Sequence, residues 1–272
     1  MDRKTNKSLA CFIFIIINLI LNSCLAVSSS YDFQLINEKI LPNQLGTFKQ
    51  LRFISADQST IIAIDAIKLS HQYHAKVYEQ KQNNQFSAHY IGQLLRYENF
   101  VIAMNGGYYS KRFQPIGLFI KEDNIITPWA NSSLLSACVK VDKSGKLSIG
   151  FNKKLCINAW SALQSGPLLI ENGNIRSRLY VTKNSSDFYE KNYRTVIALS
   201  DENEALLLVS SQAKLTDIAY ILKNNPKAFD VKHIQTAINL DGGSSTGMYI
   251  AFPSLPFYIH ELKPVKTFIM IN

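Results

Sequence analysis

Residues 237–245 read AINLDGGSS, a short apolar run that ends in a carboxylate, two glycines and two serines. Residues 100–109, FVIAMNGGYY, repeat the arrangement with an amide in place of the carboxylate. Short apolar runs bounded by glycine are typical of buried β-strands. Both stretches therefore predict a strand that stops at a glycine corner.

Corners of this kind can hold an anion. Glycine tolerates positive φ and lets the backbone approach a ligand closely, and successive N–H groups can form an anion-binding concavity. Asn105 and Asp241 would project from rigid strand ends, and Ser244 and Ser245 would add hydroxyl donors. The alternative is two ordinary tight turns. A third corner, QSGP at residues 164–167, favours the binding site, as do the second glycine and the trailing serines.

Short apolar runs continue outward from these corners along most of the chain. They lie at residues 60–64, 100–104, 116–120, 134–141, 147–149, 167–170, 195–199, 205–210 and 237–240. Many strands of this length predict a sheet-dominated domain. Turn-forming residues at 122–124, 142–145, 172–174 and 201–203 predict antiparallel hairpins.

Helical patterns are fewer. The clearest follows a candidate N-cap at Thr216, with Asp217 in the first turn and Pro226 beyond its end. A second spans residues 87–97. Without repeats or convincing linkers after residue 50, the sequence predicts a single α+β domain with a mixed, largely antiparallel sheet and a few packed helices.

The N-terminal segment has the pattern of an export signal. A basic start precedes an apolar stretch from Leu9 to Leu21, shorter than the ~20 residues that usually span a bilayer. The stretch ends Leu21-Asn22-Ser23-Cys24, which resembles a bacterial lipobox with Cys24 as the lipid-anchored residue. Ordinary cleavage after Ala26 and an uncleaved anchor are the alternatives. Cleavage by either route predicts export to the periplasm, to the outer membrane as a lipoprotein, or out of the cell.

These patterns divide the chain into three parts. Residues 1–26 form the predicted signal peptide, residues 27–58 a tether and a first strand near 33–36, and residues 59–272 the domain itself. The formal net charge of +9 suits an anionic partner. The basic residues are scattered, without the runs or aromatic interleaving of a nucleic-acid surface, so we expect no nucleic-acid partner.

Four cysteines are present. Cys11 lies inside the apolar segment and Cys24 at its end, which leaves Cys138 and Cys156 for the mature fold. In an oxidising compartment these two are a candidate disulfide, and closing a loop of that size would add about 3 kcal/mol of stability. The alternative is two buried thiols that do not meet.

Four blocks of the chain are informative together. They are Asn105–Tyr109 with Pro115–Leu118 downstream, Ser165–Leu169 with Glu171–Gly173, Arg194–Leu199, and Leu240–Ser245. These blocks resemble the phosphodiester glycosidase domain, the family of the lysosomal uncovering enzyme and of many bacterial envelope proteins. Their order and approximate spacing match across residues 60–272. The resemblance implies an α+β fold with a glycan-phosphodiester site where the blocks converge.

The sequence departs from the family in two ways. It lacks the cysteine-rich modules of animal members, and Gly243 runs directly into Ser244 where many members have a further glycine. Both departures leave the identity of the substrate open.

The candidate site combines the corners with this resemblance. The expected catalytic residues are Asp241, Arg194 and Asn105. The expected substrate-binding residues are Gly106, Gly107, Ser165, Gly166, Thr195, Gly242, Gly243, Ser244 and Ser245.

A sugar linked through C1 to a phosphodiester has a good leaving group, since the departing monoester has a second pKa near ~6. Such a site needs groups that hold the anion and a base for water. Arg194 and the Gly-Gly amides suit the first task, and Asp241 suits a base or nucleophile.

Several alternatives stay open at this stage. An ordinary glycosidase uses two carboxylates, and Glu171 is a candidate for the second, although a solvated turn residue fits it as well. Arg194 could instead be a strand-edge charge. Asp241 and Asn105 could together hold Ca²⁺ or Mg²⁺, whereas the histidines lack the spacing of a zinc site.

A second function is compatible with the same residues. A non-catalytic envelope protein could use these corners to bind an anionic glycan. Turnover separates the two hypotheses, because both predict binding. The sequence does not indicate the oligomeric state.

Overall fold

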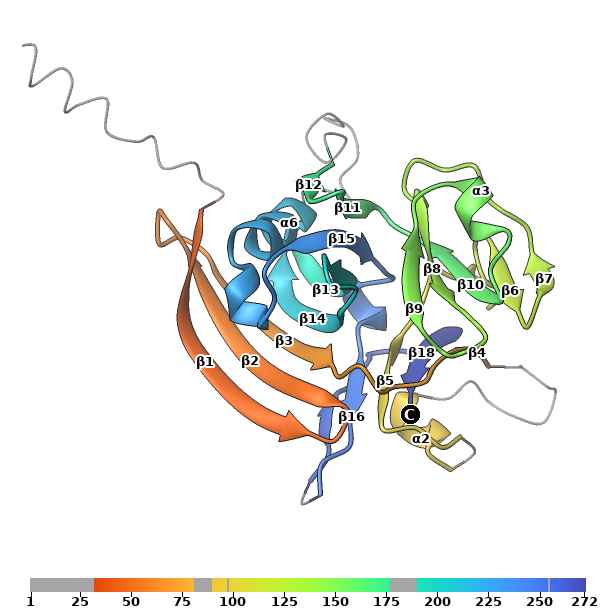
Figure 1. Ribbon diagram of the computed structural model, residues 1–272, viewed down its shortest axis with the longest axis horizontal. Helices are drawn as coiled ribbons and strands as arrows, with labels where there is room; N and C mark the ends of the chain where they lie inside the picture. Colours follow the sequence, from red (N-terminus) through yellow and green to blue (C-terminus); the bar gives the residue numbers. More distant parts are fainter. Residues whose placement is uncertain (1–31, 81–89, 97, 177–189, 254) are drawn as a thin grey trace, which may run out of the picture.

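The computed structural model describes residues 32–80, 90–96, 98–176, 190–253 and 255–272. Within them the strands form three sheets in which all neighbouring strands pair antiparallel (Figure 1). The predicted signal peptide with Cys24 lies outside these residues. Among the described helices, none has the length and apolarity needed to cross a bilayer.

The largest sheet carries eight strands. Their order across the sheet is β1 (Phe33–Asn43), β2 (Gly46–Ser55), β3 (Ile61–Leu69), β14 (Ala205–Ala213), β13 (Asn192–Ser200), β15 (Ile234–Asn239), β11 (Leu168–Glu171) and β12 (Asn174–Ile175). The first strand is therefore longer than the stretch near residues 33–36 that the sequence predicted. Ile54 pairs with Ile61, and residues 56–60 form the turn that joins β2 to β3.

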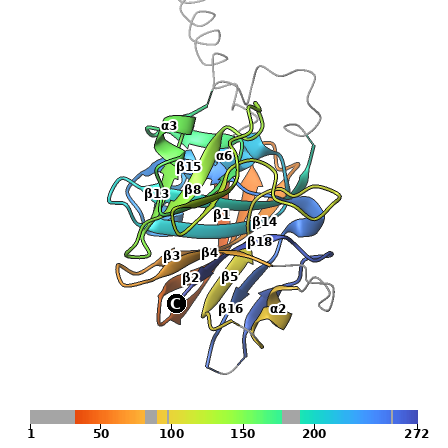
Figure 2. The same ribbon diagram turned by 90° about the vertical axis from the view of Figure 1, so that its right-hand side faces the viewer.

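Two five-stranded sheets complete the fold. The second sheet runs β7 (Asn124–Thr127), β6 (Phe119–Lys121), β10 (Ser161–Ser165), β8 (Ala137–Val141) and β9 (Leu147–Gly150). The third runs β17 (Phe257–Ile259), β16 (Met248–Ile250), β5 (Ile102–Asn105), β18 (Thr267–Ile271) and β4 (Ala75–Glu79). Figure 2 shows β4, β5, β16 and β18 of this third sheet together at the lower end of the molecule, with α2 beside them.

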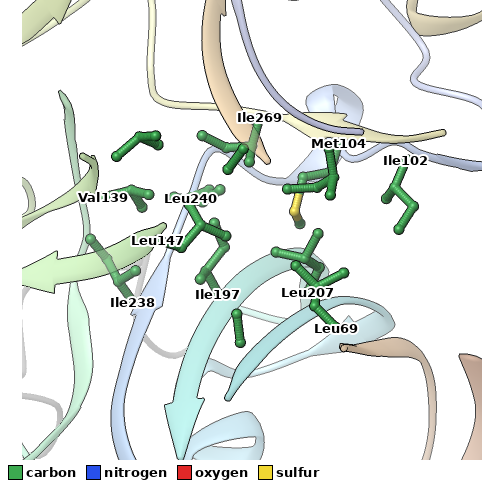
Figure 3. Close-up of a cluster of buried hydrophobic side chains, with 14 of the residues drawn as sticks. Leu69, Ile102, Met104, Val139, Leu147, Ile197, Leu207, Ile238, Leu240 and Ile269 are labelled. Carbon is green, nitrogen blue, oxygen red and sulfur yellow. The ribbon is translucent and has the colours of Figure 1, made fainter. Parts of the chain in front are cut away.

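The central core lies where the three sheets meet (Figure 3). It draws Ile197, Leu207 and Ile238 from the first sheet, Val139 and Leu147 from the second, and Met104 and Ile269 from the third. All these side chains are buried. Burying an aliphatic side chain is worth about 1.5–3 kcal/mol, so this shared core holds the ends of β5, β13 and β15 in fixed positions.

The helices are short. They are α2 (Ile91–Leu94), α3 (Lys153–Cys156), α6 (Leu215–Asn224) and the 3₁₀ turns η1 (Pro226–Phe229) and η2 (Gly243–Ser245). The described helices and largely antiparallel strands confirm the predicted α+β class. The predicted helix over residues 87–97 was too long: Tyr90 is an extended N-cap, α2 spans Ile91–Leu94, and residues 95 and 96 form a turn, while residues 87–89 and 97 lie outside the described part.

The α6 helix covers the outer face of the eight-stranded sheet. Its apolar residues pack on that sheet, as the spacing predicted. The N-cap residue is Lys214 and not the predicted Thr216. The reason is that the Asp217 carboxylate accepts the Lys214 N–H at 3.0 Å, which stabilises a start two residues earlier.

All the predicted hairpins are confirmed. They are β6–β7, β8–β9, β11–β12 and β13–β14. Asn172 and Asn203 adopt positive φ, at 49° and 59°, a conformation that Asn tolerates better than most residues.

The predicted disulfide is also confirmed. Cys138 of β8 and Cys156 of α3 are joined at an S–S distance of 2.05 Å. Gly150 lies against both sulfurs, so that a Cβ there would come within 2.8 Å of each of them. The disulfide fixes α3 on the second sheet.

Candidate active site

A cavity of about 330 Å³ opens where β13 begins and β15 ends. Val196 pairs with Asn239, and the Leu240 N–H donates to the Thr195 carbonyl at 2.8 Å. This register brings Asp241, the residue after Leu240, close to Arg194 in the neighbouring strand. The cavity is lined by Asp241, Gly242, Gly243, Arg194, Asn192, Tyr108, Leu134 and Leu215.

Asp241 is the carboxylate of this cavity. Its Oδ1 accepts the N–H of Gly242 at 2.9 Å. Burial raises the pKa of Asp241 to about 6, an effect that the Ser245 hydroxyl, the Gly242 N–H and the Lys263 charge only partly offset. The Ser245 hydroxyl is buried near the carboxylate but forms no hydrogen bond of normal geometry. Asp241 can therefore change protonation state close to neutral pH.

Asn105 lies behind Asp241 and does not line the cavity. Its Nδ2 donates to the Asp241 carbonyl at 2.6 Å. Its Oδ1 accepts the Thr195 hydroxyl at 2.8 Å and the Gly247 N–H at 3.1 Å. Asn105 and Thr195 thus hold in place the corner that carries Asp241. The sequence had instead predicted that both residues contact the substrate. Because the only side-chain oxygen of Asn105 is occupied, it forms no carboxylate–amide cation site with Asp241.

Gly106 and Gly107 do not form an anion cradle. Their N–H groups donate to the backbone carbonyl and the hydroxyl of Thr267, at 2.7 Å and 3.0 Å. A Cβ on Gly106 would lie 2.5 Å from the Thr267 hydroxyl oxygen. The first glycine pair therefore permits close packing of β5 against β18.

The second corner keeps donors near the cavity. Gly242 and Gly243 line it, and Gly243 has φ +60°, a conformation that favours glycine. The Gly242 N–H is already bonded to Asp241, but the N–H groups of Gly243 and Ser244 have no acceptor in the described part of the chain. These two donors match the predicted phosphate contact, whereas Ser245 is buried.

The third corner supports the cavity wall from behind. The Gly166 carbonyl accepts the Tyr108 hydroxyl at 2.9 Å and the Asn239 Nδ2 at 3.1 Å. A Cβ on Gly166 would lie 2.0 Å from the Leu134 carbonyl oxygen. Ser165 is fully buried and does not line the cavity, so it is not placed to bind a ligand there.

Arg194 lines the cavity but already makes internal contacts. The Arg194 side chain is buried, so it is not the solvated strand-edge charge that the sequence left open as an alternative. Its Nε donates to the Ala213 carbonyl at 2.9 Å and its Nη2 to the Glu190 carbonyl at 2.5 Å. Arg194 therefore contributes a fixed positive charge to the cavity wall.

Asp241 is the only carboxylate among the described cavity-lining residues. Glu171 pairs with Arg176 at the β11–β12 hairpin and is not a cavity residue. Within the described ranges, no group of three or more His, Cys, Asp or Glu residues could hold a metal ion.

Sequence reasoning did not select three residues near the site. They are Tyr108, Asn239 and Lys263, which the sequence did not predict as site residues. Asn239 could have been found, since it is a buried amide at the last position of β15, two residues before Asp241. Its Nδ2 donates to the Tyr108 hydroxyl at 3.1 Å.

The comparison with known families decides the family. The sequence profile of the phosphodiester glycosidases matches residues 98–271. The chain belongs to the phosphodiester glycosidase family. This family comprises hydrolases that act on phosphodiester glycosides, and the match covers every cavity-lining residue named above.

Solved structures share the fold of this phosphodiester glycosidase. The catalytic domain of zebrafish N-acetylglucosamine-1-phosphodiester alpha-N-acetylglucosaminidase, auto-inhibited by its pro-peptide, is similar with a TM-score of 0.64 and 16% identity over 93% of this chain and 92% of that one. A hypothetical protein from Synechocystis is similar with a TM-score of 0.61 and 13% identity over 89% and 68%. No curated protein matches the chain.

Proposed function

We propose that this chain is an exported enzyme that hydrolyses a sugar-1-phosphate diester of an envelope or extracellular glycan. The observation that carries the proposal is the Asp241 carboxylate in the cavity wall, with a pKa raised by burial to about 6, in a member of this family. A carboxylate with such a pKa is well matched to proton transfer near neutral pH.

The proposed reaction breaks the bond between C1 of the sugar and the phosphate oxygen. Water attacks C1, and its proton passes to Asp241. The bonding electrons leave with the phosphate oxygen, and the products are the free sugar and a phosphate monoester. Because this leaving group is stable without protonation, one carboxylate suffices where an ordinary glycosidase needs two.

The surroundings of Asp241 suit an anionic substrate. The N–H groups of Gly243 and Ser244 are donors near the cavity, and Arg194 places a positive charge in its wall. Electrostatic stabilisation of developing charge by fixed donors is a large contribution to catalysis. The proposed leaving group would therefore be held while its negative charge grows.

Export is part of the proposal. The signal-like segment at residues 1–26 supports it, with lipid attachment at Cys24 or cleavage after Ala26 as the two routes. The Cys138–Cys156 disulfide also supports it, because structural disulfides persist mainly in oxidising compartments. Mass measurement of the processed N-terminus distinguishes acylated Cys24 from ordinary cleavage.

One observation favours a second candidate, a non-catalytic protein that binds anionic glycan. Asp241 is the single carboxylate among the described residues of the cavity. The panel that separates the candidates begins with N-acetylglucosamine 1-phosphate diesters, because the zebrafish relative is named for that substrate. Binding without sugar release supports the second candidate. Release that is lost in Asp241→Asn supports the hydrolase.

Hydrolysis in ¹⁸O-labelled water identifies the bond that breaks. Label in the sugar indicates cleavage at C1, as proposed. Label in the phosphate indicates attack at phosphorus and contradicts the glycosidase reaction.

A further inference from the structure

We propose that Lys263 binds the phosphate group of the substrate beside the Asp241 cavity. This inference rests on the proposed function and names a further residue for it. Lys263 lies in the segment between β17 and β18, outside the blocks that carry the family resemblance. Its position is fixed by contacts on both sides.

The first contact joins this segment to the corner that carries Asp241. The Leu262 N–H donates to the Ser244 carbonyl at 2.8 Å. The second contact joins it to the corner at the end of β5, where the Tyr109 hydroxyl donates to the Pro264 carbonyl at 3.1 Å. Lys263 is therefore held between the turn that follows Asp241 and Tyr109, the neighbour of the cavity residue Tyr108.

The Lys263 ammonium is positioned and accessible. Its Nζ lies 5.4 Å from the centre of the Tyr109 ring, within the range of a cation–π contact. The residue is exposed, and no described carboxylate lies within ion-pairing distance of it. Lys266, in the same segment, is buried and bound to Glu79 at 3.1 Å and to the Gln80 carbonyl at 2.6 Å. Of these two lysines, Lys263 is the one able to meet a ligand.

The charge of Lys263 reaches the cavity. It is one of the influences that lower the pKa of Asp241 against the larger opposing effect of burial. An anion beside Asp241 would feel the same positive charge. Arg194 supplies charge but donates two of its nitrogens to backbone carbonyls, which leaves a role for an exposed ammonium at the phosphate.

Binding to a catalytically disabled protein tests this role. In full-length Asp241→Asn, calorimetry measures the affinity for the methyl diester of N-acetylglucosamine 1-phosphate and for the uncharged methyl glycoside of the same sugar. Adding Lys263→Met is expected to weaken the diester about tenfold and to leave the uncharged glycoside unchanged. Lys263→Arg is expected to retain the diester affinity within about threefold, because the positive charge remains.

Lys154→Met is the matched control, since Lys154 is an exposed lysine on α3. It is expected to change neither affinity. Equal affinity of the Lys263→Met protein for the diester overturns the proposal, as does an equal loss for the uncharged glycoside or no diester binding by the parent protein. Lys263-dependent binding without sugar release by the wild type would sink the hydrolase and leave the Lys263 site standing.

Discussion

Asn105 and Asp241, 136 residues apart in the sequence, are joined by a hydrogen bond of 2.6 Å from the Asn105 side-chain amide to the Asp241 backbone carbonyl. The oxygen of the same amide accepts two further hydrogen bonds, from Thr195 and Gly247. One buried side chain therefore ties the end of β5 to β13 and to both ends of the turn that carries the cavity carboxylate. Through it, the shared core determines where Asp241 lies.

Asn105→Ala is expected to destabilise the protein and to slow sugar release. The change leaves the Gly247 N–H and the Asp241 carbonyl without their side-chain partner and leaves the Thr195 hydroxyl only its contact with the Thr246 hydroxyl at 3.3 Å. Each unsatisfied buried group costs about 1–3 kcal/mol. We expect a loss of about 3 kcal/mol or more in the free energy of unfolding, measured by urea denaturation. Asn37→Ala, at an exposed position of β1, is the control and should change it by less than about 0.5 kcal/mol. Equal stability of the two variants would refute the positioning role.

Asp241→Asn is expected to stabilise the protein at alkaline pH. The folded-state pKa of about 6 lies above the ordinary value of 3.8, so the folded protein binds more protons than the unfolded chain between these values. Stability from this group is present below pH 4 and is lost as the pH rises through 6.

The asparagine variant avoids that loss, which amounts to at most about 3 kcal/mol. Thermal unfolding should therefore give a higher midpoint for Asp241→Asn than for wild type at pH 8, with the gap closing at pH 4. A variant that is less stable at pH 8 would show that burial does not raise this pKa.

Gly166→Ala is expected to damage both the fold and the cavity wall. A Cβ there would lie 2.0 Å from the Leu134 carbonyl oxygen, a distance that only backbone movement can relieve. At Gly173, which also has positive φ, the nearest atom to a Cβ lies at 3.9 Å, so Gly173→Ala carries the conformational cost alone. Gly166→Ala should lower the melting temperature much more than Gly173→Ala. Similar melting temperatures for the two variants would mean that the loop around Leu134 moves to accommodate the added Cβ at little cost in stability.

Replacing Cys138 and Cys156 together with alanine is expected to cost about 3 kcal/mol, from the entropy of the loop that the disulfide closes. The two residues are 18 positions apart. A reducing agent should lower the unfolding midpoint of the wild type and leave that of the double variant unchanged. A reductant effect of the same size on both proteins would show that the disulfide is not the cause.

Much of the fold was predictable because its signals are local. The turn residues at 122–124 and 172–174 carry their own conformational preferences, and the hairpins formed where they indicated. The full length of β1 was missed because this edge strand is mostly exposed and reads as polar. The start of α6 was placed wrongly because Asp217 caps Lys214, which the apolar spacing does not reveal.

The site was predictable only in part. Asp241 and Arg194 line one cavity, as the corners and the resemblance suggested. Asn105 was expected beside them, but a sequence does not distinguish an amide that faces a cavity from one whose hydrogen bonds are all internal. Its partners Thr195 and Gly247 lie 90 and 142 residues away. Lys263 lies in an irregular segment with no motif, so only the folded chain shows its proximity to Asp241.

The rate of sugar release from a sugar-1-phosphate diester, measured from pH 4 to pH 8 for the wild type and for Asp241→Asn, tests the central role of Asp241 most directly. Asp241 must be ionised to accept a proton or to attack, so the wild-type rate should rise with pH through about 6 and then level off. At pH 8 the variant should release sugar at least about a hundredfold more slowly than the wild type, and the gap should shrink toward pH 4, where Asp241 of the wild type is mostly protonated. Absence of release by the wild type, or equal rates for the two proteins at pH 8, would contradict the account.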